Sequence, residues 1–344
     1  MIIALDAMGG DFAPVSTVEG AIFAAKGSRH KILLVGPEKL IAEEMLKHSK
    51  KYDLVSLKNI EIVNADEIIA MDEHPVKAVR QKKDSSLSVC AKLVADRKAD
   101  AFVSMGNSGA VMAAALFYLR RIDGVLRPAI STSFPTIDGH CVISDVGANV
   151  DCKPEHLLQF GIMASLFCEK VTGIKRPRVG LVSIGEEPTK GNELTLAAFD
   201  LLKQADINFI GNVEGRDIPQ SKADVVVCDG FVGNIILKFG EGLAEMMLRL
   251  IKKALKQHPL AWASLPFLWL AIKDLRKSVD YNEAGGAPLL GVDGICIVGH
   301  GSSSGKAVKN AILAGAKAAE HNLTDGIKEA IAKYNNKEGR TIDE

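Results

Sequence analysis

The chain has 344 residues, of which 47% are hydrophobic and 24% are charged, and this composition predicts a globular protein with a sizeable core. The net charge is zero, so no general electrostatic field favours nucleic acid, and an anionic partner must meet a local basic patch. The six cysteines form no CxxC pair and fit no zinc spacing. Reduced, mostly buried thiols and no metal site are therefore expected.

Short runs rich in Val, Ile and Leu alternate with Ala-rich helical runs, which predicts a doubly wound α/β fold with a mostly parallel sheet. The first run holds Asp6 among apolar residues and is typical of a strand, not of a signal peptide. A turn at Asp138-Gly139 predicts a hairpin and some antiparallel pairing near 127–145. The predicted strands are 2–5, 32–35, 60–63, 101–103, 141–145, 179–184, 208–210, 225–228 and 295–298.

Five of these strands are followed by a loop of Gly, Asn, Asp or Ser and then by a helical run. Such loops present backbone N–H groups at a helix N-terminus, where an oxyanion such as phosphate or carboxylate binds. Chemistry is therefore expected at the carboxyl ends of a parallel sheet. The loops are DAMGGD (6–11), SMGNSG (104–109), DVGANVD (145–151), DGFVGN (229–234) and GHGSSSG (299–305).

Two nucleotide motifs are excluded at these loops. The GxGxxG fingerprint of dinucleotide-binding folds is missing from the first two loops, so no nicotinamide cofactor is expected. The fifth loop resembles a Walker A sequence but places His300 where Gly is needed. It also places Ala307 after Lys306, where a hydroxyl must coordinate Mg²⁺. Nucleotide hydrolysis is therefore not predicted.

Polar side chains in these loops and in two others are candidate ligands. Lys190 in KGNELT offers a mobile positive charge just before a helix, although a solvated loop lysine is the simpler explanation. The other polar residues are equally explained as Asx-turns or helix caps, and only their convergence favours a site. The candidate phosphate- and substrate-binding residues are Asp6, Gly9, Gly10, Asp11, Ser104, Gly106, Asn107, Ser108, Gly109, Asn149, Asp151, Asn192, Glu193, Asn212, Glu214, His300, Ser302 and Ser303.

Residues 240–281 break the alternating pattern and predict a projecting helical hairpin. Leu243, Met247 and Leu250 recur at helical spacing, and an apolar run at 259–272 follows. This run contains Pro266 and is shorter than the roughly 18–20 residues that a membrane span needs. Its apolar residues between lysines suit a membrane surface, and a dimer interface or core helix is an equal alternative. The candidate membrane contacts are Leu260, Trp262, Leu265, Phe267, Leu268 and Trp269. The tail after Thr324 is polar, and little core is expected there.

Together the motifs resemble one family, the acyl-[acyl-carrier-protein]:phosphate acyltransferases of bacterial phospholipid synthesis. The stretches DAMGGD, SMGNSGA, DVGANVDCKPEH, KGNELT, FIGNVEGRD, DVVVCDGFVGN and HGSS occur in family order over nearly the whole chain. By motif, Lys190 and Asn234 are identified as catalytic residues. Ser108 stands where Thr is expected, which keeps the hydroxyl, and Pro188 in the loop before Lys190 departs from the pattern.

The resemblance implies transfer of a fatty acyl group from acyl carrier protein to inorganic phosphate, giving acyl phosphate for phosphatidate synthesis. It implies a fold similar to isocitrate dehydrogenase and phosphotransacetylases, with residues 1–344 as a single catalytic unit and no cofactor. It also implies a cytoplasmic homodimer at the inner face of the cell membrane. The resemblance further implies a glycerol-3-phosphate acyltransferase as a downstream partner, and no nucleic-acid partner is expected.

Alternatives remain open at the level of sequence. A short-chain phosphotransacetylase that uses coenzyme A and a non-enzymatic scaffold for acyl chains or phosphates are the other functions. A covalent route would use Cys228, although a buried core thiol explains this residue more simply. An acidic carrier protein needs a basic patch, and two candidates are Lys77, Arg80, Lys82 and Lys83, or Arg120, Arg121 and Arg127.

Overall fold

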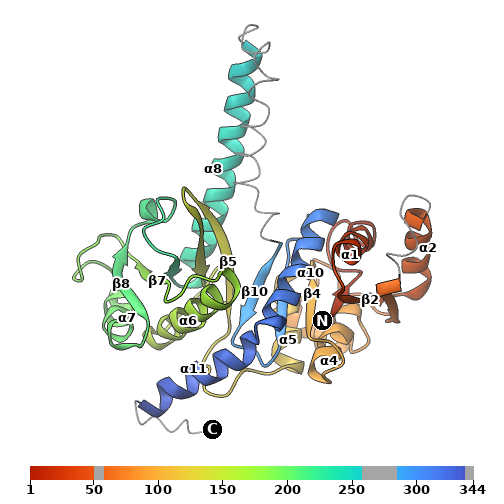
Figure 1. Ribbon diagram of the computed structural model, residues 1–344, viewed down its shortest axis with the longest axis horizontal. Helices are drawn as coiled ribbons and strands as arrows, with labels where there is room; N and C mark the ends of the chain where they lie inside the picture. The colour runs from red at the N-terminus through yellow and green to blue at the C-terminus, as the bar shows by residue number, and fades with distance from the viewer. Residues whose placement is uncertain (50–57, 258–284, 338–344) are drawn as a thin grey trace.

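The computed structural model describes residues 1–49, 58–257 and 285–337. Its described strands form one 11-stranded sheet in the order β3-β2-β1-β4-β11-β10-β5-β6-β9-β7-β8, which confirms the predicted α/β fold (Figure 1). The strands are β1 (Ile2–Asp6), β2 (Lys31–Gly36), β3 (Ile60–Asn64), β4 (Ala101–Ser104), β5 (Ala129–Thr136), β6 (Gly139–Ser144), β7 (Arg178–Val182), β8 (Asn208–Val213), β9 (Val225–Val227), β10 (Ala287–Leu290) and β11 (Ile295–Val298).

The sheet consists of two parallel halves that run in opposite directions. Strands β3, β2, β1, β4 and β11 are parallel to one another, and so are β6, β9, β7 and β8. Between the halves, β11–β10, β10–β5 and β5–β6 are three successive antiparallel pairs. The hairpin predicted at Asp138-Gly139 joins β5 to β6. These three reversals invert the second half relative to the first, and β5 and β6 confirm the antiparallel pairing predicted near 127–145.

The short strand β10 brings the carboxyl ends of the two halves together. Its first residues, Ala287 and Pro288, pair with the end of β11, and its last residues, Leu289 and Leu290, pair with the start of β5. The next residue of β5, Ser131, pairs with Ser144 at the end of β6. The loops that follow β11 and β6 therefore face each other across β10.

The helices cover both faces of the sheet. They are α1 (Val15–Gly27), α2 (Glu38–Ser49), α3 (Pro75–Gln81), α4 (Ser86–Ala95), α5 (Ser108–Tyr118), α6 (Pro154–Phe167), the π-helix η2 (Cys168–Thr172), α7 (Glu193–Gln204), the 3-10 helix η3 (Gly215–Asp217), α8 (Gly230–Gln257), α10 (Gly305–Glu320) and α11 (Leu323–Lys337). Along β1, Ile3 and Leu5 pack in the core under α1 and α10, whereas Ala4 packs in the core under α4 and α5. Burial on both faces explains the continuous apolar runs of the strands.

Two boundaries differ from the sequence prediction. Strand β7 ends at Val182, and Ile184 is 80% exposed in the loop that follows, so the predicted end at 184 is wrong. The tail after Thr324 was expected to contribute little core. It forms most of α11, and Ile327 and Ile331, four residues apart, are buried beside α6. This spacing places both side chains on one face of a helix.

Helix α8 begins at Gly230, ten residues before the predicted hairpin, and projects from the body of the molecule (Figure 1). The outer part of the predicted hairpin, including all six candidate membrane contacts, lies outside the described residues. None of the described helices is both long enough and apolar enough to cross a membrane.

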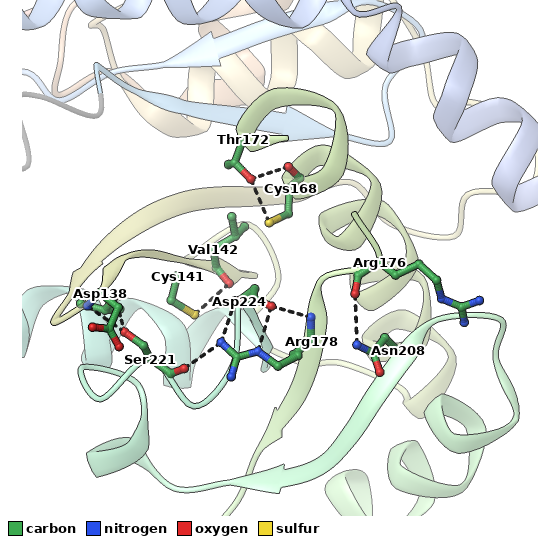
Figure 2. A network of polar contacts seen from close by, with 11 residues as sticks. Asp138, Cys141, Val142, Cys168, Thr172, Arg176, Arg178, Asn208, Ser221 and Asp224 are labelled. Atoms are coloured by element: carbon green, nitrogen blue, oxygen red, sulfur yellow. Dashed lines mark hydrogen bonds and ion pairs between the residues drawn. The ribbon is translucent and has the colours of Figure 1, made fainter. Parts of the chain in front are cut away.

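A polar network fixes β7 against β9 at the edge of the sheet where these two strands begin (Figure 2). The Arg178 guanidinium donates to both carboxylate oxygens of Asp224, at 3.1 Å from Nε and 2.8 Å from Nη2, and also to the carbonyl of Ser221. The Arg178 side chain lowers the pKa of the Asp224 carboxyl. The network lies at the end opposite to the loops with candidate ligands, so its role is structural.

Candidate active site

A pocket of about 930 Å³ lies where the loops of the two halves meet. Four of the five Gly-rich loops contribute to its lining: Ser108 after β4, Gly147 after β6, Asn234 after β9, and His300 with Ser303 after β11. The apolar part of the lining comes mainly from β5 and α8, and includes Ile130, Phe134, Ile236, Leu237, Leu243, Ala244, Met247, Leu248 and Ile251. The site therefore combines polar loops with a long apolar wall.

The remaining loop, DAMGGD (6–11), does not line the pocket and instead supports two of the other loops. The Ser104 hydroxyl donates to Asp6 Oδ2 at 2.7 Å, and the Gly106 N–H donates to Ser104 Oγ at 3.1 Å. The Asp11 N–H donates to the carbonyl of Gly301 at 2.8 Å. These bonds interlock the loops after β1, β4 and β11. Burial raises the pKa of Asp6, which favours a structural role for this carboxyl over contact with an anion.

Close packing explains two glycines of this cluster. A Cβ on Gly9 would lie 2.6 Å from Asp6 Oδ2, and a Cβ on Gly109 would lie 2.7 Å from Pro75. Gly10 has a φ of +105°, a backbone conformation that favours glycine. The predicted glycines therefore have a structural reason that is independent of phosphate.

Several polar candidates around these loops are already engaged. The Asn107 side chain caps α5 by accepting from the Ala110 N–H, and it donates to the carbonyls of Met71 and Glu73. His300 Nδ1 lies 2.8 Å from Ser302 Oγ. Helix α10 is capped by Ser304. Ser108, His300 and Ser303 remain at the pocket wall.

In the second half, Asp145 organises the DVGANVD loop. Its carboxylate accepts N–H groups from Ile130, Gly147, Ala148 and Asn149. Burial raises the pKa of Asp145. Sequence reasoning missed this residue as a site component, because it sits at the end of an apolar strand. Its position after β6 matches that of Asp6 at the end of β1, and this repetition was the available signal.

Asn149 and Asp151 do not line the pocket. The Asn149 amide donates to the carbonyl of Pro128 and to Asp145, and the Asn149 carbonyl accepts the N–H of Gly230 at 2.7 Å. Asp151 is exposed just before α6. These contacts join the loop after β6 to the start of α8.

The expectation that Asn234 lies in a loop is wrong. Helix α8 begins at Gly230, so Asn234 lies in its second turn, exposed and at the pocket. The helix begins this early because Gly233 has no side chain: a Cβ there would lie 1.9 Å from the Asp145 carbonyl oxygen. Gly230 and Gly233 lower the helix propensity of this segment, yet the packing against Asp145 requires glycine at position 233.

Lys190 lies in the loop between β7 and α7, outside the residues that line the pocket. It is exposed, and its ammonium forms no hydrogen bond or ion pair with any residue that the structure describes. Its neighbour Glu186 pairs with Lys222 at 2.7 Å instead. The positive charge of Lys190 is therefore available to a substrate.

The remaining candidates surround this loop. Asn192 caps α7 in a reciprocal pair with Thr195, and Glu193 is the first residue of that helix. The Asn212 amide donates to backbone carbonyls of the loop. Glu214 caps η3 and pairs with Arg216, a pocket residue that sequence reasoning missed because a single Arg carries no motif. Among the described residues, no three His, Cys, Asp or Glu side chains gather as a metal site.

Comparison with known proteins identifies the family. A family model described as "Fatty acid synthesis protein" matches residues 1–325. The phosphate acyltransferase of Endomicrobium trichonymphae is 78% identical over 337 residues, covering 98% of this chain and 99% of that protein. The phosphate acyltransferase of Pelotomaculum thermopropionicum is 52% identical and covers 96% and 95%. The chain belongs to the phosphate acyltransferase family. It is therefore an acyltransferase of lipid biosynthesis, as the motifs predicted.

Solved structures share the fold with this member of the phosphate acyltransferase family. A phosphotransacetylase from Streptococcus pyogenes superimposes with a TM-score of 0.63 at 16% identity, covering 93% of this chain and 94% of that chain. The EutD phosphotransacetylase from Staphylococcus aureus has a TM-score of 0.60 at 17% identity, with the same coverage. At such identities the likeness establishes the fold alone, and it confirms the predicted phosphotransacetylase-like architecture.

Proposed function

We propose that this protein transfers a fatty acyl group from acyl carrier protein to inorganic phosphate, by direct attack of bound phosphate on the thioester. The single observation that supports this best is the pocket, in which polar loops from both halves of the sheet adjoin an apolar wall. Phosphate fits the loop ends, and a long acyl chain fits the wall of β5 and α8. The relatives named phosphate acyltransferase act on the same acceptor.

The reaction needs positioning and charge stabilisation more than a strong base. Phosphate carries nucleophilic oxyanions near neutral pH, because its second pKa is about 6 by analogy with phosphate esters. A phosphate oxygen forms a bond to the acyl carbon, and the carbon–sulfur bond breaks. The carrier protein leaves as a thiolate, which is a good leaving group because the pKa of a thiol is about 8.5. The product is an acyl phosphate.

Lys190 and Asn234 have separate roles in this proposal. Lys190 starts outside the pocket lining, and in this proposal its mobile side chain reaches the reacting carbonyl and stabilises the negative charge that develops in the tetrahedral transition state. Asn234, at the pocket wall in the second turn of α8, orients phosphate or donates to the oxyanion. Ser108, His300 and Ser303 complete the polar end of the pocket.

A covalent route through Cys228 is disfavoured. The thiol is buried and does not line the pocket, and Sγ donates to the Asp145 carbonyl. Burial and the neighbouring carboxylates of Asp229 and Asp145 raise the pKa of Cys228 well above its ordinary value. The reactive thiolate is therefore scarce, since burial penalises the charged form.

The deciding experiment compares three acyl donors. We expect the purified protein to form acyl phosphate from long-chain acyl carrier protein, and to use acetyl coenzyme A poorly because the apolar wall is then unfilled. Faster turnover of acetyl coenzyme A would favour a short-chain phosphotransacetylase. Binding of acyl chains or phosphate without product would favour a scaffold.

We also propose a homodimer that associates peripherally with the membrane, with a glycerol-3-phosphate acyltransferase as the enzyme that uses the product. Helix α8 carries an exposed apolar stripe suited to a second copy: Phe231, Ile235, Phe239, Leu243, Met246 and Leu250. These positions fall within one third of the helix circumference, centred opposite the face of Leu237, Ala244 and Leu248 that lines the pocket, although Phe239 and Leu243 also border the pocket. The proposal of membrane association is based on the apolar sequence of 259–272. The double variant Trp262→Glu/Leu268→Glu should bind vesicles more weakly in a co-sedimentation assay, and unchanged binding would contradict the proposal.

For docking of the carrier protein, the patch on α3 is the better of the two candidates. Helix α3 packs against α5, whose first residue Ser108 lines the pocket. Lys77, Arg80 and Lys83 are exposed there, whereas Lys82 is paired with Glu73 at 2.7 Å. In the other patch, the Arg121 guanidinium is held by the carbonyls of Val125 and Leu126.

A further inference from the structure

The backbone around Lys190 is held by two side chains from the ends of neighbouring strands. The Lys190 carbonyl accepts from Ser183 Oγ at 2.9 Å and from Asn212 Nδ2 at 3.4 Å. Asn212 Nδ2 also donates to the Glu187 carbonyl at 2.9 Å, and the Lys190 N–H donates to that carbonyl at 3.0 Å. The turn from Glu187 to Lys190 is therefore closed on itself and attached to both β7 and β8.

The attachment to β8 leaves a buried hydrogen-bond acceptor of Asn212 without a described partner, and stability of the fold does not explain why such a residue is used. Asn212 is only 5% exposed, and its Oδ1 has no hydrogen-bond partner among the residues that the structure describes. Its amide cannot simply be turned over, because Oδ1 would then face two carbonyl oxygens. A buried acceptor without a partner destabilises a fold, so an apolar residue of similar size would serve stability better. The amide nitrogen is what the position requires.

The Lys190 side chain is directed by the same turn. A Cβ on Gly185 would lie 2.9 Å from Lys190 Cγ, so the lysine stem lies close against this glycine. Gly191, with a φ of +139°, follows Lys190 and leads into the cap of α7. The stem therefore leaves a backbone that is fixed on both sides, and only the end of the side chain is free to move.

We infer that Asn212 is a positioning residue for acyl transfer, which holds the Lys190 backbone so that the ammonium meets the transition state. This inference rests on the proposed function, because it gives Lys190 a role in the reaction. Asn212 contacts no substrate in this scheme and acts only through Lys190. Its contribution is to the geometry of the charge, so it affects kcat more than the binding of the acyl donor.

The test replaces Asn212 by Leu, which removes the amide donor and the unpaired acceptor together. We expect kcat to fall about tenfold, less than the ~10²-fold expected for loss of a transition-state donor. The KM for acyl carrier protein should change little, and the melting temperature should be kept or raised. Asn208→Leu is the matched control, because Asn208 lies at the other end of β8 and its amide donates to the Arg176 carbonyl (Figure 2). It should leave kcat unchanged.

A double-mutant cycle separates positioning from a structural effect. If Asn212 acts through Lys190, Asn212→Leu should cause no further loss in a Lys190→Ala background. Losses that multiply overturn the positioning role while leaving the proposed function intact. Full activity of Lys190→Ala overturns both roles but not acyl transfer itself, which the donor assay tests separately. Should Asn212→Leu fold poorly, Ser183→Ala removes the other donor to the same carbonyl. The loss of kcat caused by Ser183→Ala must then also be absent in the Lys190→Ala background.

Discussion

Two buried aspartates occupy matching positions in the two halves of the molecule. Asp6 ends β1 and Asp145 directly follows β6, and each accepts the N–H of the second residue after it, Met8 or Gly147. Both carboxyls thereby fix the shape of a loop before any ligand arrives. The N–H groups that they bind are no longer available to phosphate, so the phosphate must be bound by donors farther along the loops.

At the residue scale, Lys190→Ala tests the proposed chemistry. The variant should lose about 10²-fold in kcat/KM, the usual effect of losing one donor to a developing oxyanion. Steady-state acyl phosphate formation measures this loss. Lys203→Ala is a matched control, because Lys203 is an exposed lysine in the last turn of α7, the helix that follows the Lys190 loop. Full activity of Lys190→Ala would remove the lysine from the mechanism.

At the scale of elements, the start of α8 against the loop after β6 holds the second half of the site together. Gly230 donates to the Asn149 carbonyl at 2.7 Å, and Gly233 lies directly against the Asp145 carbonyl. The second contact leaves no room for a side chain at Gly233. Asn234 reaches the pocket because the helix is seated this closely.

Gly233→Ala should therefore destabilise the fold by about 2–4 kcal/mol, since the added methyl must displace backbone. Gly242→Ala is the matched control on the same helix. A Cβ at Gly242 meets nothing within 4 Å, so this change should stabilise by about 0.5–1 kcal/mol through helix propensity. Urea unfolding of both variants measures the difference, and equal effects would contradict this account of the helix start.

The same elements define what could be predicted from the sequence. The buried parallel strands were predictable as apolar runs, and their loops as Gly and Asn clusters. Strand β10 was missed because it has four residues and contains Pro288. The opposite direction of the two halves was not predictable, because apolar periodicity does not encode strand direction. Asp6 and Asn107 hold loops together through hydrogen bonds to residues that are distant in the sequence, which no local pattern reveals.

At the scale of the whole molecule, α8 presents two faces with different partners. One face lines the pocket, and the other carries the exposed stripe, of which Phe231, Ile235, Met246 and Leu250 lie outside the pocket lining. An exposed apolar stripe of this length is characteristic of an interface. The proposed second copy would cover this stripe and would come next to the pocket at Phe239 and Leu243.

Met246→Glu, in the middle of the stripe and outside the pocket lining, should therefore weaken self-association, because a charge would be buried in the interface. Light scattering coupled to size exclusion should give the mass of two chains for the wild type and of one for the variant at low micromolar concentration. Lys252→Glu, an exposed position on the other side of α8, is the control and should leave the mass unchanged. A single-chain mass for the wild type would contradict the dimer.

The unbroken course of α8 has a mechanical consequence. A helix of 28 residues is about 42 Å long and behaves as a stiff rod on that scale. At its inner end Gly233 lies directly against the Asp145 carbonyl, and Asn234 is the next residue of the helix. A tilt of the outer end of α8 therefore turns the helix about Gly233. A contact that fixes the outer end of α8 would also fix the angle at which Asn234 faces the pocket.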